Sequence, residues 1–461
     1  MAGPWGAGFA SLLEEHDYQV DEIEGRVPAA LRGTLFRNGS GRNQLAGRWF
    51  PHWFDGDGMI QAIRFDNGIH YRNRFVATGN WRDETHAGRI RHRGFGKMRP
   101  GGVLANAFRL PANVSNTSVV LTDGKLLSLW EGGPPYQLDP ATLETKGVED
   151  FGGTLKAFSA HPRIDPVSGE LFNFGIDYGP RTTLTPYRMQ GGRVTKLPAV
   201  TLPYPLMNHD FVLTERHLVF CLGPILVHSL KFALGFASFD GALHWDGGKP
   251  TLILLLPRDG GPSRFIEAEP FFQFHFANGY EQDGAIVLDL ARYPDYTVIG
   301  EALRTYWQSD WPARGMATLT RLRIELGSGK IDSRAWSAGS ANEFPRFDLR
   351  RTGKPYRYVY IACNPADRTH GLQQQIAKID LETGVSAVQD FGPQGYAGEP
   401  LFIPTGDGED DGVVVTTVFD AAARRSAIVG LDARDLAAKP LFTARLRHAV
   451  PYALHGCFVP A

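Results

Sequence analysis

The sequence predicts an all-β fold, and more specifically a β-propeller whose blades differ in size. Short runs of β-branched and aromatic residues alternate with turns along the chain, at a spacing typical of sandwiches, barrels and propellers. Long helical periodicity is scarce. Glycine and proline contribute 53 and 31 residues, together about 18% of the chain, which exceeds their average share of about 12% and indicates many turns.

The elements can be justified in chain order. The most helix-like segment, Trp5–His16, comes before the fold proper. Strand pairs follow wherever two apolar runs flank a turn, because such a pattern favours a hairpin. The clearest pairs are Ser118–Leu121 with Leu126–Trp130, Tyr356–Ala362 with Ile376–Asp380, and Gly412–Phe419 with Ala427–Leu431.

A turn that begins with aspartate recurs at strand ends. It starts at Asp139, Asp165, Asp380 and, in a weaker form, Asp432. Aspartate initiates such turns, and their irregular spacing favours a propeller of unequal blades over a sandwich. Seven blades of about 66 residues would account for the chain. No proline- or serine-rich linker divides it, so we expect a single propeller domain over residues 1–461.

Charge and cysteine content exclude several classes of protein. Lys and Arg number 48 against 49 Asp and Glu, so we expect no nucleic-acid partner. Three cysteines (Cys221, Cys363 and Cys457) form no disulfide framework, which favours a reducing compartment. The N-terminus does not resemble a secretory signal, and the apolar run Thr251–Leu256 is too short to span a bilayer. We expect a cytoplasmic monomer that at most lies peripherally on a membrane.

Four of the fourteen histidines lie in unusual settings. His161 precedes a proline, His209 lies just ahead of a strand-like run, His275 is enclosed by phenylalanines, and His455 lies near the C-terminus. Because each propeller blade presents one inner strand to the axis, residues far apart in sequence can meet there. Four neutral imidazoles without a thiolate would suit iron, copper, zinc or nickel. Their spacing does not choose among these metals.

Three glutamates are candidates for orienting those imidazoles. Glu131 follows a hydrophobic strand, Glu343 precedes Phe-Pro, and Glu399 lies between glycine and proline. A lone acid among apolar neighbours is costly unless it is paired. Metal-bound histidines usually donate their second N–H to a carboxylate, which would supply the pairing. The alternative is that these glutamates are exposed loop residues.

Nine sequence blocks, in order, are shared with a known family. They are Gly33–Gly39; His52–Met59; Asn116–Thr117 with Leu129–Gly133; Ser159–Pro166; His209–Phe211; Phe274–His275; Glu343–Pro345 with Gly353–Tyr356; Gly398–Pro400 with Glu409–Gly412; and Leu454–Gly456. On these blocks the chain resembles the carotenoid cleavage oxygenase family along nearly its whole length. The runs Trp130–Pro135, Ser159–Pro166 and Pro451–Gly456 make it most similar to the bacterial apocarotenoid-15,15'-oxygenases.

The resemblance implies a seven-bladed β-propeller with a loop and helix cap over an axial, non-haem Fe(II) site. The implied metal ligands are His161, His209, His275 and His455, and the implied carboxylate partners of these ligands are Glu131, Glu343 and Glu399. No side chain beyond the metal centre is implied in catalysis. The implied reaction uses O2 as co-substrate and cleaves a C=C bond of an apocarotenoid, at the 15,15' bond, to give retinal-type aldehydes.

Three positions depart from the family's pattern. Ser40 replaces a turn proline, which a turn tolerates, and Phe276 replaces a second histidine found after the ligand in many members. Trp130 stands where lignostilbene-cleaving members carry a phenol-binding lysine, so phenolic stilbenes are disfavoured.

A polyene substrate requires a long apolar passage and a route from the membrane. We expect the passage to be lined by Phe54, Thr117, Trp130, Phe274 and Phe276, with core packing as the alternative for the aromatic residues. The apolar stretch Pro224–Phe239 is expected to form a membrane patch. The residues expected to insert are Phe232, Leu234 and Phe236, and the alternative is a buried strand pair.

Two other functions remain open on the sequence alone. The chain could cleave a different polyene bond or a stilbenoid, because the cut position depends on how far the substrate slides into the passage. It could also be a propeller that binds a partner without chemistry, since fold does not fix function. The presence of all four histidines favours chemistry.

Overall fold

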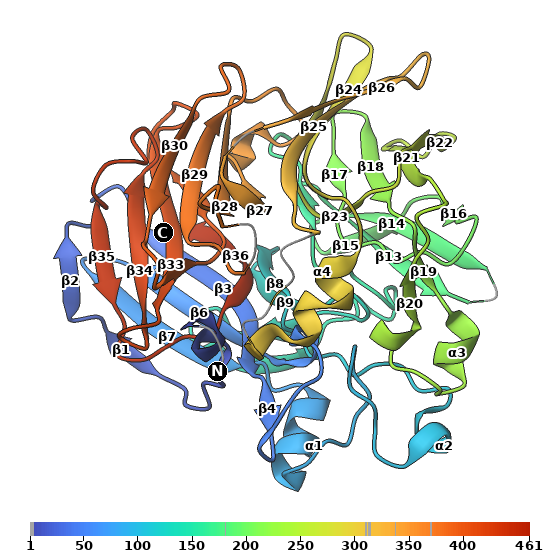
Figure 1. The fold of residues 1–461 in the computed structure, drawn as a ribbon, viewed down its shortest axis with the longest axis horizontal. Helices are drawn as coiled ribbons and strands as arrows, with labels where there is room; N and C mark the ends of the chain where they lie inside the picture. Colours follow the sequence, from blue (N-terminus) through green and yellow to red (C-terminus); the bar gives the residue numbers. More distant parts are fainter. Residues whose placement is uncertain (1–3, 180, 309–310, 312–314, 337, 369–370) are drawn as a thin grey trace.

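The computed structural model consists mainly of antiparallel β-sheets arranged around a central axis (Figure 1). It describes residues 4–179, 181–308, 311, 315–336, 338–368 and 371–461. Within these ranges, seven sheets have four to six strands each, and they form the blades of the predicted seven-bladed propeller.

The first blade joins the two ends of the described chain. Its strand order is β1-β7-β6-β3-β36, and β36 runs antiparallel to β3 from Gly33 opposite Pro460 to Gly39 opposite Ala453. This pairing closes the ring of blades and places the strand that carries His455 at the end of the sheet. The strands are β1 (Asp17–Gln19), β3 (Gly33–Arg42), β6 (Asp57–Phe65), β7 (Ile69–Phe75) and β36 (Ala453–Pro460).

The second to fourth blades follow in sequence order. The second contains β8 (Ser118–Thr122), β9 (Lys125–Leu129), β10 (Tyr136–Leu138) and β11 (Thr145–Val148). The third contains β12 (Arg163–Ile164), β13 (Leu171–Tyr178), β14 (Thr182–Gln190), β15 (Arg193–Lys196) and β16 (Val200–Thr201). The fourth contains β17 (Val212–Leu213), β18 (His217–Leu222), β21 (Thr251–Pro257) and β22 (Arg264–Ala268).

The last three blades complete the ring, and the seventh also takes a strand from the N-terminal region. The fifth contains β23 (Phe272–Gln282), β24 (Ala285–Tyr293), β25 (Thr318–Glu325) and β26 (Ile331–Ala335). The sixth contains β27 (Ser340–Arg346), β28 (Tyr358–Asn364), β29 (Gln375–Asp380) and β30 (Ser386–Asp390). The seventh contains β2 (Glu22–Gly25), β31 (Gly395–Ala397), β32 (Leu401–Pro404), β33 (Gly412–Asp420), β34 (Arg425–Asp432) and β35 (Phe442–Arg445).

Short helices and two small hairpins lie outside the blades. They are the hairpins β4 (Gln44–Leu45) with β5 (Arg48–Trp49) and β19 (Ile225–Val227) with β20 (Leu243–Trp245); the helices α1 (Gly79–Ala87), α2 (Gly102–Asn106), α3 (Ser229–Ala233) and α4 (Thr297–Gly300); and the 3-10 turns η1 (Pro4–Phe9), η2 (Trp53–Asp55), η3 (Asp240–Ala242), η4 (Ala302–Arg304), η5 (Tyr306–Gln308) and η6 (Leu349–Arg351). Several of these share one hydrophobic cluster with Phe272, Phe274 and Leu454, beside two of the histidines. The elements that share this cluster form the predicted cap.

The predicted hairpins and aspartate turns are present. Ser118–Thr122 pairs with Lys125–Leu129, and the two later predicted pairs form β28 with β29 and β33 with β34. In three of the four predicted turns an aspartate Oδ1 accepts hydrogen bonds from two backbone N–H groups that follow it. The side chain thereby replaces a backbone acceptor and fixes the turn. These aspartates are Asp139, Asp165 and Asp380.

The helix-like N-terminal segment is the element that differs from the expectation. Only Pro4–Phe9 is helical, as a 3-10 turn. Glycines at positions 6 and 8 weaken an α-helix, and a Cβ on Gly8 would lie 2.5 Å from the ring of Tyr452. Packing of Phe9 against Trp53 and Tyr452 therefore decides the local conformation.

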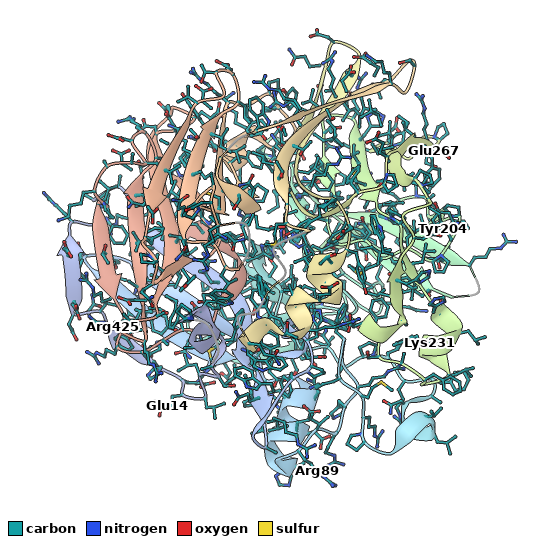
Figure 2. All side chains as sticks on the ribbon, viewed as in Figure 1. Glu14, Arg89, Tyr204, Lys231, Glu267 and Arg425 are labelled. Atoms are coloured by element: carbon teal, nitrogen blue, oxygen red, sulfur yellow. The ribbon has the colours of Figure 1, made fainter. Side chains whose placement is uncertain are left out.

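The surface is mixed in charge. Labelled side chains such as Glu14, Arg89, Lys231 and Arg425 project from the periphery (Figure 2). No helix in the described part of the chain combines the length and the apolar character that a membrane span requires.

Candidate metal centre

The four predicted histidines meet at the axis of the propeller. His161 lies two residues before the short end strand β12 and His209 three residues before β17, whereas His275 and His455 lie within β23 and β36. One nitrogen of each imidazole lies within 4.8 Å of the corresponding nitrogen of the other three. The two closest, Nε2 of His161 and Nε2 of His209, are 2.8 Å apart. Four strand ends from four blades therefore converge on one point.

Each of the three predicted glutamates faces the Nδ1 atom of one histidine. Glu343 Oε2 lies 2.5 Å from His275 Nδ1, and Glu399 Oε1 lies 2.9 Å from His455 Nδ1. Glu131 Oε1 lies 3.2 Å from His209 Nδ1. His161 has no carboxylate partner among the described residues. A carboxylate at Nδ1 holds the N–H on that atom and directs the lone pair of Nε2 toward the centre.

Irregular backbone sets the direction of two of these side chains, those of His275 and Glu343. The pairing of β23 with β24 shifts register on both sides of Phe276, next to His275. The pairing of β27 with β28 shifts on both sides of Glu343, whose neighbour Phe344 has a φ of 55°. β-Bulges re-aim side chains at the rims of sheets, and strained φ values in non-glycine residues gather at functional sites. Regular strands would not place His275 and Glu343 face to face.

Glu343 is held on both oxygens. Tyr293 donates its hydroxyl proton to Oε1 at 2.6 Å, and the backbone N–H of Phe344 donates to Oε2 at 2.6 Å. Burial acts to raise the pKa of Glu343, but His275 and these donors outweigh it, so the pKa lies below its usual value. The carboxylate is therefore ionised at neutral pH.

Of the three glutamates, Glu399 is the one that lies closest to positively charged side chains. Arg346 Nε lies 3.1 Å from Oε1, Arg37 Nη2 lies 3.9 Å from Oε2, and the backbone N–H of Gly456 donates to Oε2 at 3.0 Å. Burial acts to raise the pKa of Glu399, but Arg346 and then His455 lower it to about 2. Glu131 is more open, with about a third of its side chain exposed.

The donor set fits a divalent transition metal. Burial lowers the pKa of His455 to about 4 and, together with the neighbouring imidazoles, lowers that of His161 well below its usual value, so both rings are neutral. All four donors are imidazole nitrogens, a ligand type that suits iron and other divalent transition metals. Nε2 of His275 is buried and has no hydrogen-bond partner in the described structure, an arrangement that a bound ion would relieve.

Most of the predicted passage residues lie beside this centre. Phe274 stacks edge-on with His209 at a centroid distance of 5.2 Å and contacts Phe54 at 6.1 Å. Thr117 is buried, and its carbonyl accepts the backbone N–H of His455. Trp130 is buried next to Glu131. Phe276 lies in a different hydrophobic cluster, between the fourth and fifth blades, because the register shift turns it away from Phe274.

Sequence reasoning missed a second group of aromatic residues. Phe95 contacts Phe54 at 5.4 Å and Phe239 at 5.6 Å, and Phe239 contacts Phe232 at 5.5 Å. Together with Phe274 and Phe54 they form a continuous chain of rings from His209 toward α3, which we call the aromatic file (Phe274, Phe54, Phe95, Phe239 and Phe232). Phe95 gave no sequence signal because it lies in an irregular segment between two glycines.

The predicted membrane residues differ in exposure. Phe236 is 63% exposed, whereas Phe232 and Leu234 are partly buried. The guanidinium of Arg93 covers the ring of Phe232 at 3.9 Å. The exposed apolar side chains near Phe236 come from two segments that meet through a hydrogen bond from Phe108 N–H to the carbonyl of Ala233. This exposed patch consists of Val103, Leu104, Phe108, Leu110, Leu230 and Phe236.

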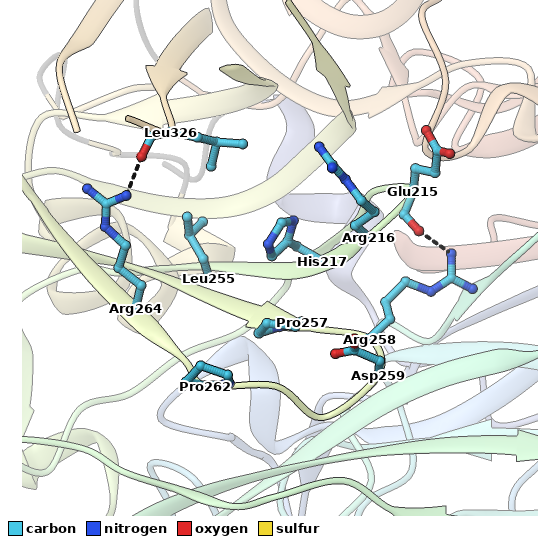
Figure 3. A pocket seen from close by; sticks show the side chains of 10 residues that line it. All are labelled: Glu215, Arg216, His217, Leu255, Pro257, Arg258, Asp259, Pro262, Arg264 and Leu326. Carbon is cyan, nitrogen blue, oxygen red and sulfur yellow. Dashed lines mark hydrogen bonds between the residues drawn. The ribbon is translucent and has the colours of Figure 1, made fainter. Parts of the chain in front are cut away.

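A surface hollow of about 580 Å³ lies elsewhere, at the ends of β18, β21 and β22 (Figure 3). Two of its arginines are already paired: Arg216 binds Glu281, and Arg258 binds Asp165. None of the four histidines lines it, so it is separate from the metal centre. Its residues are Glu215, Arg216, His217, Leu255, Pro257, Arg258, Asp259, Pro262, Arg264 and Leu326.

Comparisons with known proteins agree with this geometry. The family described as retinal pigment epithelial membrane protein matches residues 9–460. The apocarotenoid-15,15'-oxygenase of Synechocystis is 35% identical over 98% of this chain and 95% of its own length, and the isoeugenol monooxygenase of Pseudomonas putida is 30% identical over 98% and 97%. The crystal structure of the cobalt-substituted Synechocystis enzyme aligns with 99% of this chain over 98% of its own chain, with a TM-score of 0.92 and 34% identity.

The match spans the whole propeller and includes all four histidines. The chain therefore belongs to the family of the retinal pigment epithelial membrane protein, the carotenoid cleavage oxygenases.

Proposed function

We propose that the chain is a non-haem iron(II) dioxygenase that oxidatively cleaves one C=C bond of an apocarotenoid, acting as a single propeller domain over residues 1–461. The observation that carries this proposal is the convergence of four imidazoles, of which His209, His275 and His455 are buried and have a carboxylate at Nδ1. The residues proposed to hold the iron are His161, His209, His275 and His455, with Glu131, Glu343 and Glu399 as their hydrogen-bond acceptors.

Iron(II) supplies the one-electron chemistry that lets triplet dioxygen react with a closed-shell alkene. Overall, one O2 and one C=C bond give two carbonyl groups, so no proton has to be added or removed. That balance agrees with a site in which Glu131, Glu343 and Glu399 each pair with an imidazole and Asp210 pairs with Arg163. The protein's part is to fix the four nitrogens, keep the imidazoles of His161 and His455 neutral and exclude water from the polyene.

The aromatic file supports a linear apolar substrate. Its rings run from His209 through Phe274 and Phe54 to Phe95 and Phe239, and all are buried or partly buried. A polyene can slide along such a surface through dispersion contacts, with few polar groups to satisfy. Thr117 lies beside His455 and would limit access to the metal with its methyl group.

Trp130 supports a polyene over a phenol. The position next to Glu131 holds a buried indole, so it offers no cation to a phenolate. The Pseudomonas relative is named for isoeugenol, so a phenolic substrate is the competing class. The relative at 35% identity is named for the 15,15' bond, and we propose the same cut here, with retinal-type aldehydes as products.

The exposed patch supports a peripheral membrane contact. Six large exposed apolar side chains come from the segments around α2 and α3, which are joined by the hydrogen bond from Phe108 N–H to Ala233, and Leu104 is 91% exposed. Single exposed apolar residues are common, but several on two adjoining segments support an interaction surface. A lipid bilayer is the reservoir of a lipid-soluble substrate, and we propose that this patch rests on it.

The test is the mass of the product after aerobic incubation of the iron form with an 8'-apocarotenal. A C20 aldehyde as the main product supports the 15,15' cut. Aldehydes of another length would contradict the cut position and leave the oxygenase class in place. Failure to cleave any apocarotenal, with cleavage of isoeugenol or a hydroxystilbene, would overturn the substrate assignment.

A further inference from the structure

One short segment links the exposed patch to the aromatic file. We call it the strap (Arg93, Gly94, Phe95, Gly96 and Lys97), and it lies between α1 and α2. Both of its ends are buried cations, since Arg93 is 2% exposed and Lys97 is 1% exposed. Its middle residue, Phe95, is a member of the aromatic file. A shift of the strap would therefore shift a wall of the proposed passage.

Arg93 binds the strap to the two segments that carry the exposed patch. Its guanidinium donates to backbone carbonyls on both sides, at 3.1 Å and 2.9 Å to the α2 side and at 2.9 Å to Phe232 on the α3 side. It also stacks on the ring of Phe232. The four carbonyl acceptors belong to Asn106, Arg109, Phe232 and Ala237.

Lys97 binds the other end of the strap to α1, which contains Glu84. Its Nζ lies 3.1 Å from Glu84 Oε2 and 4.3 Å from the centroid of the Phe50 ring. Glu84 Oε1 in turn accepts the backbone N–H groups of Arg91 and His92, both at 2.9 Å. One buried acid thus binds both the beginning and the end of the segment that contains the strap.

Asp55 holds the strap next to Phe95. The backbone N–H of Gly96 donates to both of its carboxylate oxygens, at 3.1 Å and 3.0 Å. A Cβ on Gly94 would lie 2.2 Å from Asp55 Oδ1, so only glycine allows this approach. Asp55 directly follows Phe54 of the aromatic file. The contact therefore sets the distance between Phe54 and Phe95.

The charge balance around Asp55 depends on Lys97. Asp55, Asp57 and Glu84 are buried acids, and Lys97 and Arg42 are the buried bases beside them. Burial raises the pKa of Asp55 to about 7, and Lys97 is the main influence that opposes the rise. Without Lys97 the pKa of Asp55 would rise further, and protonation would remove one of the two acceptors that hold Gly96.

We propose that Lys97 is a positioning residue for substrate binding, which fixes Phe95 in the aromatic file through Glu84 and Asp55. The inference rests on the proposed passage for an apolar polyene. It assigns a role in binding to a buried ion pair that touches neither the metal ligands nor the file itself. Removing the cation should loosen the strap and weaken polyene binding without changing the metal centre.

The test compares three variants with the parent, all loaded with iron. Lys97→Met keeps the length of the side chain and removes its charge. The double variant Glu84→Gln with Lys97→Met removes both charges of the pair, which often restores stability because no uncompensated charge stays buried. Lys378→Met is the matched control, because Lys378 is also buried, pairs with Asp410 at 2.6 Å and lies over the ring of Tyr358 at 4.1 Å.

Two quantities separate positioning from stability. The Kd for an 8'-apocarotenal is measured by tryptophan quenching without oxygen, and KM and kcat are measured in air. We expect Lys97→Met to raise Kd and KM about tenfold with kcat and iron content little changed, the pattern of lost uniform binding. We expect the double variant to recover the Tm of the parent while Kd stays raised, and Lys378→Met to lower Tm alone.

Two results would overturn the proposal. One is a parental Kd and KM in Lys97→Met, and the other is a double variant that recovers Kd together with Tm. If Lys97→Met does not fold, the double variant carries the same comparison. A parent that binds the polyene without cleaving it would contradict the proposed reaction, while the affinities would still decide the role of Lys97.

Discussion

Tyr293 donates its hydroxyl proton to Oε1 of Glu343 at 2.6 Å, while Oε2 of the same carboxylate lies 2.5 Å from His275 Nδ1. The phenol, the acid and the imidazole therefore form one buried chain that ends at the metal centre. Such a chain fixes the orientation of the imidazole more firmly than a carboxylate alone.

This chain predicts a graded loss of iron affinity. Glu343→Gln should weaken iron binding by about 10–100-fold, the usual range for partners of metal ligands. Tyr293→Phe should have a smaller effect, because Phe344 N–H still holds the carboxylate. The measurement is iron retention against a competing chelator. Tyr356→Phe is the control, since its hydroxyl donates to Asp289 at 2.7 Å. Equal iron affinity in all three variants would contradict the chain.

Replacing any of the four histidines with alanine should remove most of the bound iron and the activity. The metal-free variants should nevertheless differ in stability. His275→Ala leaves the buried Glu343 without its imidazole, whereas His161→Ala leaves no carboxylate unpaired among the described residues. An uncompensated buried charge costs about 3–5 kcal/mol. Thermal unfolding should therefore place Tm of His275→Ala below that of His161→Ala, and full iron occupancy in either would contradict the ligand assignment.

Local patterns in the sequence predicted the strands but not the contacts between blades. The runs Ser118–Leu121 and Gly412–Phe419 and the turns at Asp139 and Asp380 depend on neighbouring residues, so the pattern contains the information. The pairing of Glu343 with His275 depends on two register shifts in different blades, which no local pattern records. The resemblance supplied these residues as a set, and the structure supplied their pairing.

The sequence did not reveal the direction of two side chains, Phe276 and Phe232. Strand alternation would place Phe274 and Phe276 on one face, but the bulge after Gln273 separates them into different clusters. Phe232 looked like a membrane residue in an apolar stretch, but Arg93, far away in sequence, covers it. The most exposed apolar residue, Leu104, was missed because its segment is short and lies next to basic residues.

Glu399 and Glu131 should behave differently when each is changed to glutamine. Glu399 neutralises Arg37, which is fully buried, and Arg346. Glu399→Gln should therefore lower the free energy of unfolding by about 3–5 kcal/mol as well as weakening iron binding. Glu131 is partly exposed, so Glu131→Gln should weaken iron binding with little loss of stability. Denaturant unfolding of the metal-free proteins measures the free energies of unfolding of the two variants. Equal stability of the two would contradict this assignment.

The interactions of Glu281, which lies away from the metal centre, predict that the stability of the protein depends on pH. It accepts hydrogen bonds from Thr214 at 2.8 Å and Arg216 Nε at 2.6 Å and lies 2.9 Å from His217 Nδ1. Burial acts to raise its pKa, but His217, Thr214 and Arg216 lower it to about 2 from 4.5. A depressed pKa contributes stability that is complete above the unfolded pKa and is lost as pH falls through the folded pKa.

The parent should therefore exceed Glu281→Gln in free energy of unfolding at neutral pH. The difference should shrink below about pH 4.5 and vanish near pH 2. Urea unfolding at a series of pH values measures it. A difference that stays constant from pH 7 to pH 3 would show that the glutamine changes packing rather than a charge interaction.

The exposed patch predicts membrane partition. Leu104, Phe108 and Phe236 are 91%, 80% and 63% exposed, so serine at these positions costs the fold little. Each apolar side chain buried in lipid contributes about 1.5–3 kcal/mol, so the triple serine variant should lose more than tenfold in liposome binding. Cleavage of substrate delivered in detergent should be spared, because none of the three belongs to the aromatic file. Serine at Leu13, Val167 and Val385, which are also exposed, is the matched control. Liposome binding that falls equally in both triple variants would mean that general surface hydrophobicity, and not this patch, drives the contact.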